Sequence, residues 1–407
     1  MMRNPFSRNT ALALCAALLL VLFASQARAQ APTQNYRDSL QLRLSEISQQ
    51  TNLPGFAVGI VNPEGIVYED GFGYANLEKK TKFTPQTIEN IGSVSKTLIG
   101  VSIMQLVDAG KLTLETKIND ILPFKVVHPR FPHQEITVWQ LATHTAGIVD
   151  GDQYNQQCYV LLEDFVAGGQ RKDEKQYFRR IKKNVERPMR DFLADYLVPK
   201  GKHYKKKNFN KYAPGTHYAY TNIGATLAAL VVEIVAQEPY SDYTKKHILE
   251  PLKMHNSGWK LSEIDKGKEA MLYFKDHLPM PKYTLITYPD GGLLSNCHDM
   301  SLYLQKMMNC HAGLNSFLQP SSVSEMMKTQ FKAEREQSGI FWDVARNGRI
   351  GHTGGDPGIF TIMQFDPETK TGYVFLTNIA GFDDQEMLID FRKIWKAMAK
   401  YGAKIKG

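Results

Sequence analysis

The sequence predicts an α+β fold: an α/β sandwich in which one antiparallel sheet, built from both ends of the chain, is flanked by helices and carries a mostly helical inserted region. Three observations support this prediction. Strand-like segments lie near the N-terminus and again near the C-terminus, and the segments between them have the apolar periodicity of helices. Strands at the two ends must pair with one another, because their backbone groups need hydrogen-bond partners.

The first 29 residues have the order of a secretory signal peptide. Arg3 and Arg8 precede an apolar run from Ala11 to Ala24, and the Ala-Arg-Ala triplet at 27–29 offers small residues at a cleavage point. The run is too short to span a bilayer comfortably, and an uncleaved anchor is the alternative. We therefore expect residues 30–407 to form the mature protein and to be periplasmic or secreted.

The N-terminal part of the mature chain predicts a helix followed by a hairpin. Residues 36–51 have one apolar stripe, and two strands, Phe56–Val61 and Ile66–Asp70, are joined across the Asn-Pro-Glu-Gly segment at 62–65. The helical stripe consists of Leu40, Leu44 and Ile47.

Helical periodicity continues through the middle of the chain. A helix is expected from Ser93 to a C-terminal Gly110, and a short one over 137–142. Residues 222–236 are apolar nearly all round and predict a buried helix, whereas 296–309 are amphipathic. At the C-terminus, strands at 360–365 and 373–378, joined by a turn at 366–372, precede a helix from Asp384 to about Lys400. The sheet region thus covers about 30–92 and 287–407, and the helical region about 93–286.

The positive charge is concentrated in residues 171–211. This stretch holds fifteen lysines and arginines against five acidic residues, while the whole chain has a formal net charge of +8. It predicts a helix near 173–186, with an apolar stripe at Phe178, Ile181 and Val185, and a second helix that begins at Pro188. An anionic cell-envelope polymer or a membrane surface is a possible partner, and a solvated helix face is the plainer interpretation. No aromatic residues are arranged to stack on a nucleic acid.

Three cysteines, Cys158, Cys297 and Cys310, remain after the signal segment. Cys297 and Cys310 lie at the two ends of the expected helix at 296–309. Thirteen helical steps separate them by roughly 20 Å, and a disulfide needs Cα atoms within about 7 Å. We expect no disulfide between these two residues.

Three short motifs carry the candidate chemistry. Ser93 and Lys96 are three residues apart at a helix start, so the lysine can reach the serine hydroxyl and act as a base when burial removes its proton. Tyr220 and Asn222 precede the buried helix and supply a proton-transfer group and an amide. A strand entering the final hairpin carries the third motif, in which the amide of the last glycine can join that of Ser93 in an oxyanion hole; the motif is His352, Thr353, Gly354 and Gly355.

Each motif also occurs elsewhere by chance. Ser257 and Lys260 repeat the first spacing, Tyr74 and Asn76 the second, and His311–Gly313 and Lys370–Gly372 approach the third. Lys370 falls in a polar turn, which favours His352 as the residue on the strand. For His144 we expect a helix-packing role.

The three motifs in this order resemble the serine β-lactamase and penicillin-binding-protein superfamily, in its branch of class C β-lactamases, D-Ala-D-Ala carboxypeptidases and esterases. The resemblance runs from about Leu53 to Asn378 and includes GSVSKTLIGVSIMQLVDAGKLTLETKINDILP from Gly92, LATHTAGI from Leu141, PGTHYAYTNIGATL from Pro214, DGGLLSNCHDMSLYL from Asp290 and GHTGGDPGIF from Gly351.

The resemblance implies a β-lactamase/transpeptidase-like catalytic domain over 30–407, with no metal and no cofactor. It makes Ser93 the nucleophile, Lys96 the base, Tyr220 the proton relay and Asn222 a substrate ligand, with the 352–355 strand as the far wall. Class C β-lactamases carry lysine where this chain has His352, so the chain is more similar to the peptidase and esterase members.

The expected function is therefore hydrolysis of an amide or ester through an acyl-enzyme, with D-amino-acid peptides or carboxylic esters as substrates. A class C-like β-lactamase is one alternative. A catalytically silent binding protein that retains the fold is an alternative of another class.

Overall fold

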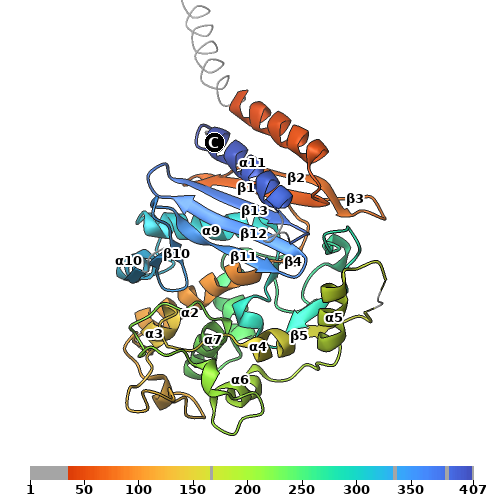
Figure 1. Ribbon diagram of the computed structural model, residues 1–407. Helices are drawn as coiled ribbons and strands as arrows, with labels where there is room; N and C mark the ends of the chain where they lie inside the picture. Colours follow the sequence, from red (N-terminus) through yellow and green to blue (C-terminus); the bar gives the residue numbers. More distant parts are fainter. Residues whose placement is uncertain (1–34, 166–167, 333–336, 381–384, 406–407) are drawn as a thin grey trace, which may run out of the picture.

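The computed structural model describes residues 35–165, 168–332, 337–380 and 385–405 (Figure 1). The predicted signal segment, residues 1–29, lies outside the described residues. Within those ranges one antiparallel sheet has nine strands, which are β1 (Gly55–Asn62), β2 (Gly65–Asn76), β3 (Thr81–Lys82), β8 (Phe331–Lys332), β9 (Gln337–Ser338), β10 (Asp343–Val344), β11 (Ile350–Asp356), β12 (Ile359–Asp366) and β13 (Thr371–Thr377).

The sheet joins the two ends of the chain. Its order is β3-β2-β1-β13-β12-β11-β10-β9-β8, so the first long strand lies beside the last one. Phe56 pairs with Thr377 across β1 and β13, and Phe360 pairs with Thr377 across β12 and β13. The predicted α+β fold, with an antiparallel sheet built from both chain ends, is confirmed.

The helical elements lie on both faces of this sheet and beyond its lower edge in Figure 1. Besides a helix at 35–50, they are α2 (Lys96–Asp108), α3 (Val138–Ala142), α4 (Asp152–Gln157), α5 (Lys172–Ile181), α6 (Met189–Leu197), α7 (Asn222–Ala236), α8 (Tyr240–Thr244), α9 (Cys297–His311), α10 (Pro320–Met327) and α11 (Gln385–Gly402). Short helical turns are η1 (Gly92–Ser95), η2 (Ile118–Asp120), η3 (Lys206–Asn208), η4 (Lys245–Leu249), η5 (Lys266–Lys268) and η6 (Tyr288–Asp290), and two small sheets pair β4 (Glu89–Asn90) with β7 (Leu294–Ser295) and β5 (Tyr159–Leu161) with β6 (Tyr283–Leu285).

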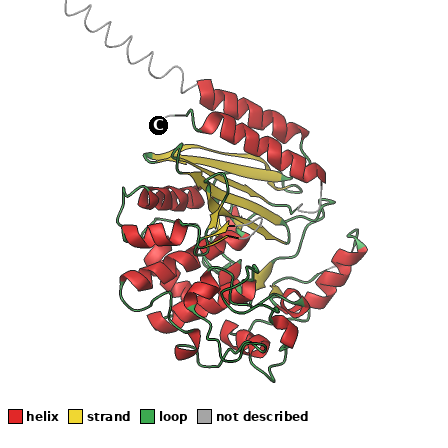
Figure 2. Ribbon diagram, turned by 60° about the vertical axis from the view of Figure 1, so that its left-hand side comes forward, coloured by secondary structure: helices red, strands yellow, loops and turns green. Residues whose placement is uncertain are grey.

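One face of the sheet is covered by the helix at 35–50 and by α11, which run side by side in Figures 1 and 2. Alternate residues of β1 point to this layer and pack in one buried cluster with the predicted helical stripe and with α11. The cluster includes Leu40, Leu44, Ile47, Phe56, Val58, Ile60, Phe391, Ile394 and Met398.

The opposite face of the sheet packs on α9, and below α9 lie α2 and α7 (Figure 1). Gly59 of β1 permits the close approach of α9, because a Cβ atom there would lie 2.3 Å from the Ser301 hydroxyl oxygen. Helix α7 spans 222–236, the range that the sequence predicted, and its residues from Ile223 to Val232 are buried.

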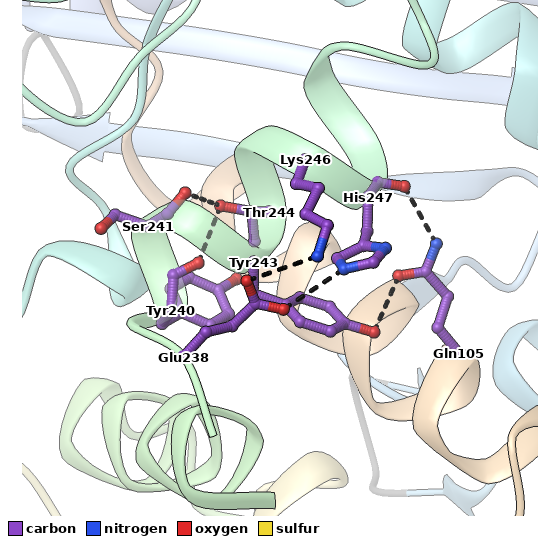
Figure 3. Close-up of polar contacts among 8 residues, drawn as sticks. All are labelled: Gln105, Glu238, Tyr240, Ser241, Tyr243, Thr244, Lys246 and His247. Carbon is purple, nitrogen blue, oxygen red and sulfur yellow. Dashed lines mark hydrogen bonds and ion pairs between the residues drawn. The ribbon is translucent and has the colours of Figure 1, made fainter. Parts of the chain in front are cut away.

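Helix α2, which carries Lys96, is hydrogen-bonded to α8 and to the turn that follows it (Figure 3). The Gln105 amide donates to the His247 carbonyl (3.2 Å) and accepts from the Tyr243 hydroxyl (3.2 Å). Glu238 accepts from His247 at 3.3 Å and lies 3.9 Å from the Lys246 ammonium. These contacts fix the C-terminal half of α2 and thereby the position of its first turn.

Two details of the basic stretch differ from the prediction. Helix α5 ends at Ile181, and Val185, placed on its apolar stripe, is 72% exposed. Only Phe178 and Ile181 are buried there, because the chain turns after α5 and Asn184 donates to the Gln156 and Tyr159 carbonyls, both at 2.8 Å. The three cysteines at 158, 297 and 310 are free and buried, so the expectation of no disulfide between the last two is confirmed.

No single helix in the described part of the chain has the length and apolar character needed to cross a membrane. Helix α7 and the segment Tyr240–Leu249 satisfy that criterion only together, and they are bent by 80° at the break between them.

The packing of the helical layer against β1 generates a stability prediction. Phe56 is fully buried and lies against Phe72 and Phe375, with ring centroids 5.0 and 5.9 Å away. Phe56→Ala is expected to lower the free energy of unfolding by about 3–5 kcal/mol in urea titrations, because it leaves a cavity between sheet and helices. Leu42→Ala, at a side chain 64% exposed, is the control and should change it by less than about 0.5 kcal/mol. Equal losses in the two variants would contradict this packing.

Candidate active site

Ser93 and Lys96 meet at the junction of the 3₁₀ turn η1 and helix α2. The Lys96 ammonium donates to the Ser93 hydroxyl at 2.9 Å and also to the backbone carbonyl of Asp290. Lys96 is completely buried, and burial lowers its pKa, while the carboxylates around it act in the opposite direction. The turn begins with Gly92 at φ +53°, a left-handed conformation that suits glycine.

Tyr220 lies over this pair. Its hydroxyl shares a hydrogen bond with Ser93, and its ring centroid is 5.1 Å from the Lys96 ammonium nitrogen. Enclosure by neighbouring groups raises the pKa of Tyr220 well above its ordinary value, so the phenol keeps its proton at neutral pH. The residue directly precedes Thr221, the N-cap of α7, and the start of that helix therefore sets its position.

The start of α7 is fixed by Asp150, a residue that sequence reasoning did not single out. Its carboxylate accepts from the backbone amides of Asn222 (2.7 Å) and Ile223 (3.0 Å) and from the Thr221 hydroxyl (2.8 Å). These bonds satisfy amides that have no partner within the helix. Asn222 is half-buried, and its side chain is not among those that line the cavity described below.

The third motif lies on β11, packed against η1. A Cβ atom at Gly354 would lie 2.1 Å from the Ile91 carbonyl oxygen, and one at Gly92 would lie 2.8 Å from the Gly355 amide nitrogen. Glycine at these positions lets the strand and the turn approach until the amide of Gly355 lies beside the turn that carries Ser93. The sheet order, with β11 reached through β1, β13 and β12, is what brings this strand to the serine.

His352 faces Tyr220, with ring centroids 6.3 Å apart. Burial lowers the pKa of His352, with a smaller contribution from the Lys96 charge, whereas Asp343 raises it. The Nδ1 atom lies 2.6 Å from the Thr353 carbonyl oxygen, which assigns the proton of the neutral ring to Nδ1 and leaves Nε2 as an acceptor.

A cavity of about 420 Å³ opens over Ser93. Six of the eight predicted residues line it, namely Ser93, Tyr220, His352, Thr353, Gly354 and Gly355, and Lys96 lies beneath it. Sequence reasoning missed the rest of the lining, which is Tyr218, Gln337, Asp343, Val344, Ala345 and Arg346. Most of these residues come from strands of only two residues and the turn after them, which have no periodicity to recognise.

His144 corrects one expectation. Its ring lies 4.5 Å from that of Tyr220, and its Nδ1 accepts from the Thr221 amide at 3.3 Å. Burial lowers the pKa of His144 well below its ordinary range, with the Lys96 charge as a further cause. The neutral imidazole of His144 thus packs against Tyr220 and bonds to the residue that caps α7, rather than lying between two helices.

Two further carboxylates are buried near Lys96. Asp290 accepts from the hydroxyls of Tyr154 (3.1 Å) and Thr226 (2.9 Å), and Asp356 accepts from the Tyr159 hydroxyl. Burial raises the pKa of Asp290 to about 6 and that of Asp356 to about 7. For Asp356 the nearby Asp290 charge is an additional cause.

The chance repeats of the motifs have other roles. The Ser257 hydroxyl bonds to Ser295 and to the Asp299 carboxylate, both at 2.8 Å. Lys370 lies in the exposed turn between β12 and β13 with φ +51°, as its turn signal predicted. Neither Ser257 nor Lys370 lines the cavity over Ser93.

The chain belongs to the β-lactamase family, whose model matches residues 40–393. Among curated proteins it is similar to protein Flp of Staphylococcus aureus strain MW2, 22% identical over 336 residues, which cover 81% of this chain and 61% of Flp. It is also similar to the human mitochondrial serine β-lactamase-like protein LACTB, 24% identical over 400 residues, which cover 80% of this chain and 71% of LACTB. The chain thus spans about three fifths of the length of Flp.

Solved structures of the same fold include three neighbours. The octameric penicillin-binding protein homologue from Pyrococcus abyssi has a TM-score of 0.70 and 25% identity, and the alignment covers 89% of this chain and 77% of that one. A class C β-lactamase has a TM-score of 0.66 and 20% identity, with 89% and 96% covered. A penicillin-binding protein from Bacillus halodurans has a TM-score of 0.65 and 23% identity, with 87% and 98% covered.

The buried carboxyls generate a pH prediction. A carboxyl whose folded pKa lies above its unfolded value stabilises the fold fully below about pH 4, and that stability is lost as pH rises through the folded pKa. For Asp356, with a folded pKa of about 7, the loss falls between about pH 4 and pH 7. The Asp356→Asn side chain cannot ionise, so the variant should not share this loss. Between pH 4 and pH 8 the free energy of unfolding should therefore decrease by about 2–4 kcal/mol less in the variant than in the wild type.

Urea titrations at the two pH values measure this difference. Asp152→Asn, at an exposed residue paired with Lys207, is the control and should follow the wild type. If Asp356→Asn and the wild type lose stability in parallel, the carboxyl is not carrying the pH dependence.

Proposed function

We propose that this protein is a serine hydrolase that forms an acyl-enzyme on Ser93 and hydrolyses an amide or ester bond. The observation that carries the proposal is the single hydroxyl of Ser93, which bonds to both the Lys96 ammonium and Tyr220 at the floor of an open cavity. A nucleophile, a buried amine and a phenol at one point are the groups that acyl transfer needs.

The first step is attack on the substrate carbonyl. Burial lowers the pKa of Lys96, so a neutral amine becomes accessible and can take the Ser93 proton as the serine oxygen bonds to the carbonyl carbon. The carbonyl π electrons move to its oxygen. The amides of Ser93 and Gly355 are proposed to donate to that oxyanion, since β11 and η1 approach each other closely at these residues.

The second step releases the leaving group. As the bond between the carbonyl carbon and the leaving nitrogen or oxygen breaks, Tyr220 passes a proton to the leaving atom and regains one from Lys96, 5.1 Å from its ring centre. His144 and His352, both neutral, flank the phenol and keep it oriented. Water then attacks the acyl-serine by the reverse sequence of proton transfers and releases the acid.

We propose D-amino-acid peptides or carboxylic esters as the substrates. In support, the third motif has His352 where class C β-lactamases have lysine, and two of the structural neighbours are a penicillin-binding protein and a homologue of one. Asn222 is proposed to contact bound substrate from the start of α7. Hydrolysis of a β-lactam is the competing activity, favoured by the class C neighbour.

Replacing the nucleophile tests the proposal directly. Ser93→Ala is expected to lower kcat for nitrophenyl acetate by about 10³-fold or more, because no acyl-enzyme can form, while the circular dichroism spectrum stays unchanged. Ser257→Ala removes the serine of the other S-x-x-K sequence and should retain wild-type turnover. Full activity in Ser93→Ala would refute the assignment, and the absence of Ser93 labelling by a fluorophosphonate would indicate a silent binding protein.

The charge environment of Lys96 predicts the effect of Asp290→Asn on the pH profile. The rate should rise with pH as Lys96 loses its proton. Four carboxylates raise the pKa of Lys96, and Asp290 has the largest effect, followed by Asp356, Asp150 and Asp343. Removing its charge lowers the Lys96 pKa, so the rising limb of kcat/KM should move to lower pH. The measurement is ester hydrolysis from pH 5 to pH 10, with Asp152→Asn as control. A limb that stays in place or moves to higher pH would contradict Lys96 as the base.

A substrate panel separates the proposed classes. Purified protein should turn over either D-Ala-D-Ala peptides or short-chain nitrophenyl esters at least about tenfold faster than a chromogenic cephalosporin, judged by kcat/KM. The Ser93→Ala variant is the blank for each substrate. Faster turnover of the cephalosporin than of both other classes would move the protein to the β-lactamases.

A further inference from the structure

Outside the cavity over Ser93, a basic groove lies between helices α4 and α5. Helix α5 is at the right-hand side of the helical region in Figure 1. It has a volume of about 890 Å³. Its lining has five cations, four amides and no acidic residue, and consists of Lys172, Lys175, Arg179, Arg180, Lys183, Gln156, Gln157, Gln176 and Asn184.

The spacing of apolar and basic residues along α5 gives the helix a buried side and a basic side. Phe178 and Ile181 lie on its buried side, in a small cluster with Phe165, Phe274 and Met280. Lys172, Lys175 and Arg179 recur at intervals of three and four residues, which places them along another side of the helix. Arg180 and Lys183 extend the set at and just beyond its C-terminal end. The groove is therefore one continuous strip of positive charge.

The acidic residues of this segment do not neutralise the strip. The two acids of α5, Asp173 and Glu174, both pair with Arg171 at its N-terminus, at 3.7 and 3.0 Å. Asp164 pairs with Lys182, which lies outside the groove, at 3.0 Å. Among the described residues none of the five groove cations has an ion pair or a side-chain hydrogen bond.

The walls of the groove are held in place, which distinguishes it from a row of free surface lysines. Asn184 is bonded to the end of α4 and to β5 through the Gln156 and Tyr159 carbonyls. Tyr177 of α5 packs against Tyr159, with ring centroids 6.4 Å apart. The five cations are thus kept at one site despite their mutual repulsion, and an anion bound there would remove that repulsion.

We propose that this groove binds a linear polyanion that carries several closely spaced phosphate groups. From Lys172 to Arg180 the cations extend over about 12 Å of helix, longer than one phosphate group, so a chain of phosphates fits the strip better than a single anion. The strip is concave and lies between two helices, so a flexible chain can enter it, whereas a flat lipid surface contacts only protruding residues. The lining amides can donate to the phosphate oxygens between the cations.

The proposal does not depend on the serine chemistry, because no groove residue lines the cavity over Ser93. The probe is inorganic polyphosphate, titrated against the full protein by fluorescence anisotropy at several salt concentrations. The test variant is Lys175→Gln/Arg179→Gln. The matched control is Lys202→Gln/Lys206→Gln, which removes two exposed charges from the same basic stretch outside the groove.

The groove variant is expected to bind polyphosphate at least about tenfold more weakly and with a shallower salt dependence than the wild type. The control should stay within about twofold of the wild type, and the Ser93→Ala protein should bind normally. Equal weakening in the groove and control variants would overturn the proposal in favour of unspecific attraction by net charge. Binding to vesicles containing phosphatidylglycerol without binding to polyphosphate would overturn it in favour of a membrane surface. Ester hydrolysis by the groove variant should equal that of the wild type, so failure here and failure of the proposed hydrolase are distinguishable.

Discussion

The site depends on one buried ammonium group. Lys96 has no contact with solvent, and its nitrogen is held between the Ser93 hydroxyl and the Asp290 carbonyl. Desolvation favours the neutral amine, and four carboxylates favour the charged one. The balance of these opposing effects sets the pKa of Lys96. The charge on Lys96 in turn affects the ionisable groups around Ser93. Both neighbouring histidines, His144 and His352, have lowered pKa values partly because of the same charge.

Three parts of the fold supply the groups that surround Lys96. The turn η1 supplies Ser93 and helix α2 supplies Lys96, Tyr220 directly precedes the capped start of α7, and β11 supplies the opposite wall. These pieces are far apart in the sequence, and the sheet brings them together only because its order places the C-terminal strands next to β1. The glycines at 92 and 354 then decide how close the wall comes, since a side chain at either position would collide with the backbone opposite.

The sequence predicted the elements with strong periodicity and missed those that tertiary contacts create. The apolar run at 222–236 defines α7 because nearly every residue is buried, and the apolar runs at 56–61 and 360–365 define β1 and β12 because the sheet has a helical layer on each face. The helix expected to reach residue 186 ends at Ile181, since its last turn is replaced by side-chain bonds to a neighbouring segment. Asp150, Asp290 and Asp356 carry no local signal: each becomes significant only through partners more than fifty residues away.

The same tertiary contacts connect the basic inserted segment to the hydrolase core. Tyr154 of α4 bonds to Asp290, whose carbonyl holds Lys96, and Tyr159 of β5 bonds to Asp356 at the end of β11. Helix α4, which carries Tyr154, also supplies Gln156 and Gln157 to the lining of the groove. A change at Tyr154 or Tyr159 can therefore act on the cavity through these two hydrogen bonds without touching substrate. Asp150, Tyr154 and Tyr159 are accordingly structural supports of the candidate active site, whereas the groove cations lie further along the chain, on the exposed side of α5 and just after it.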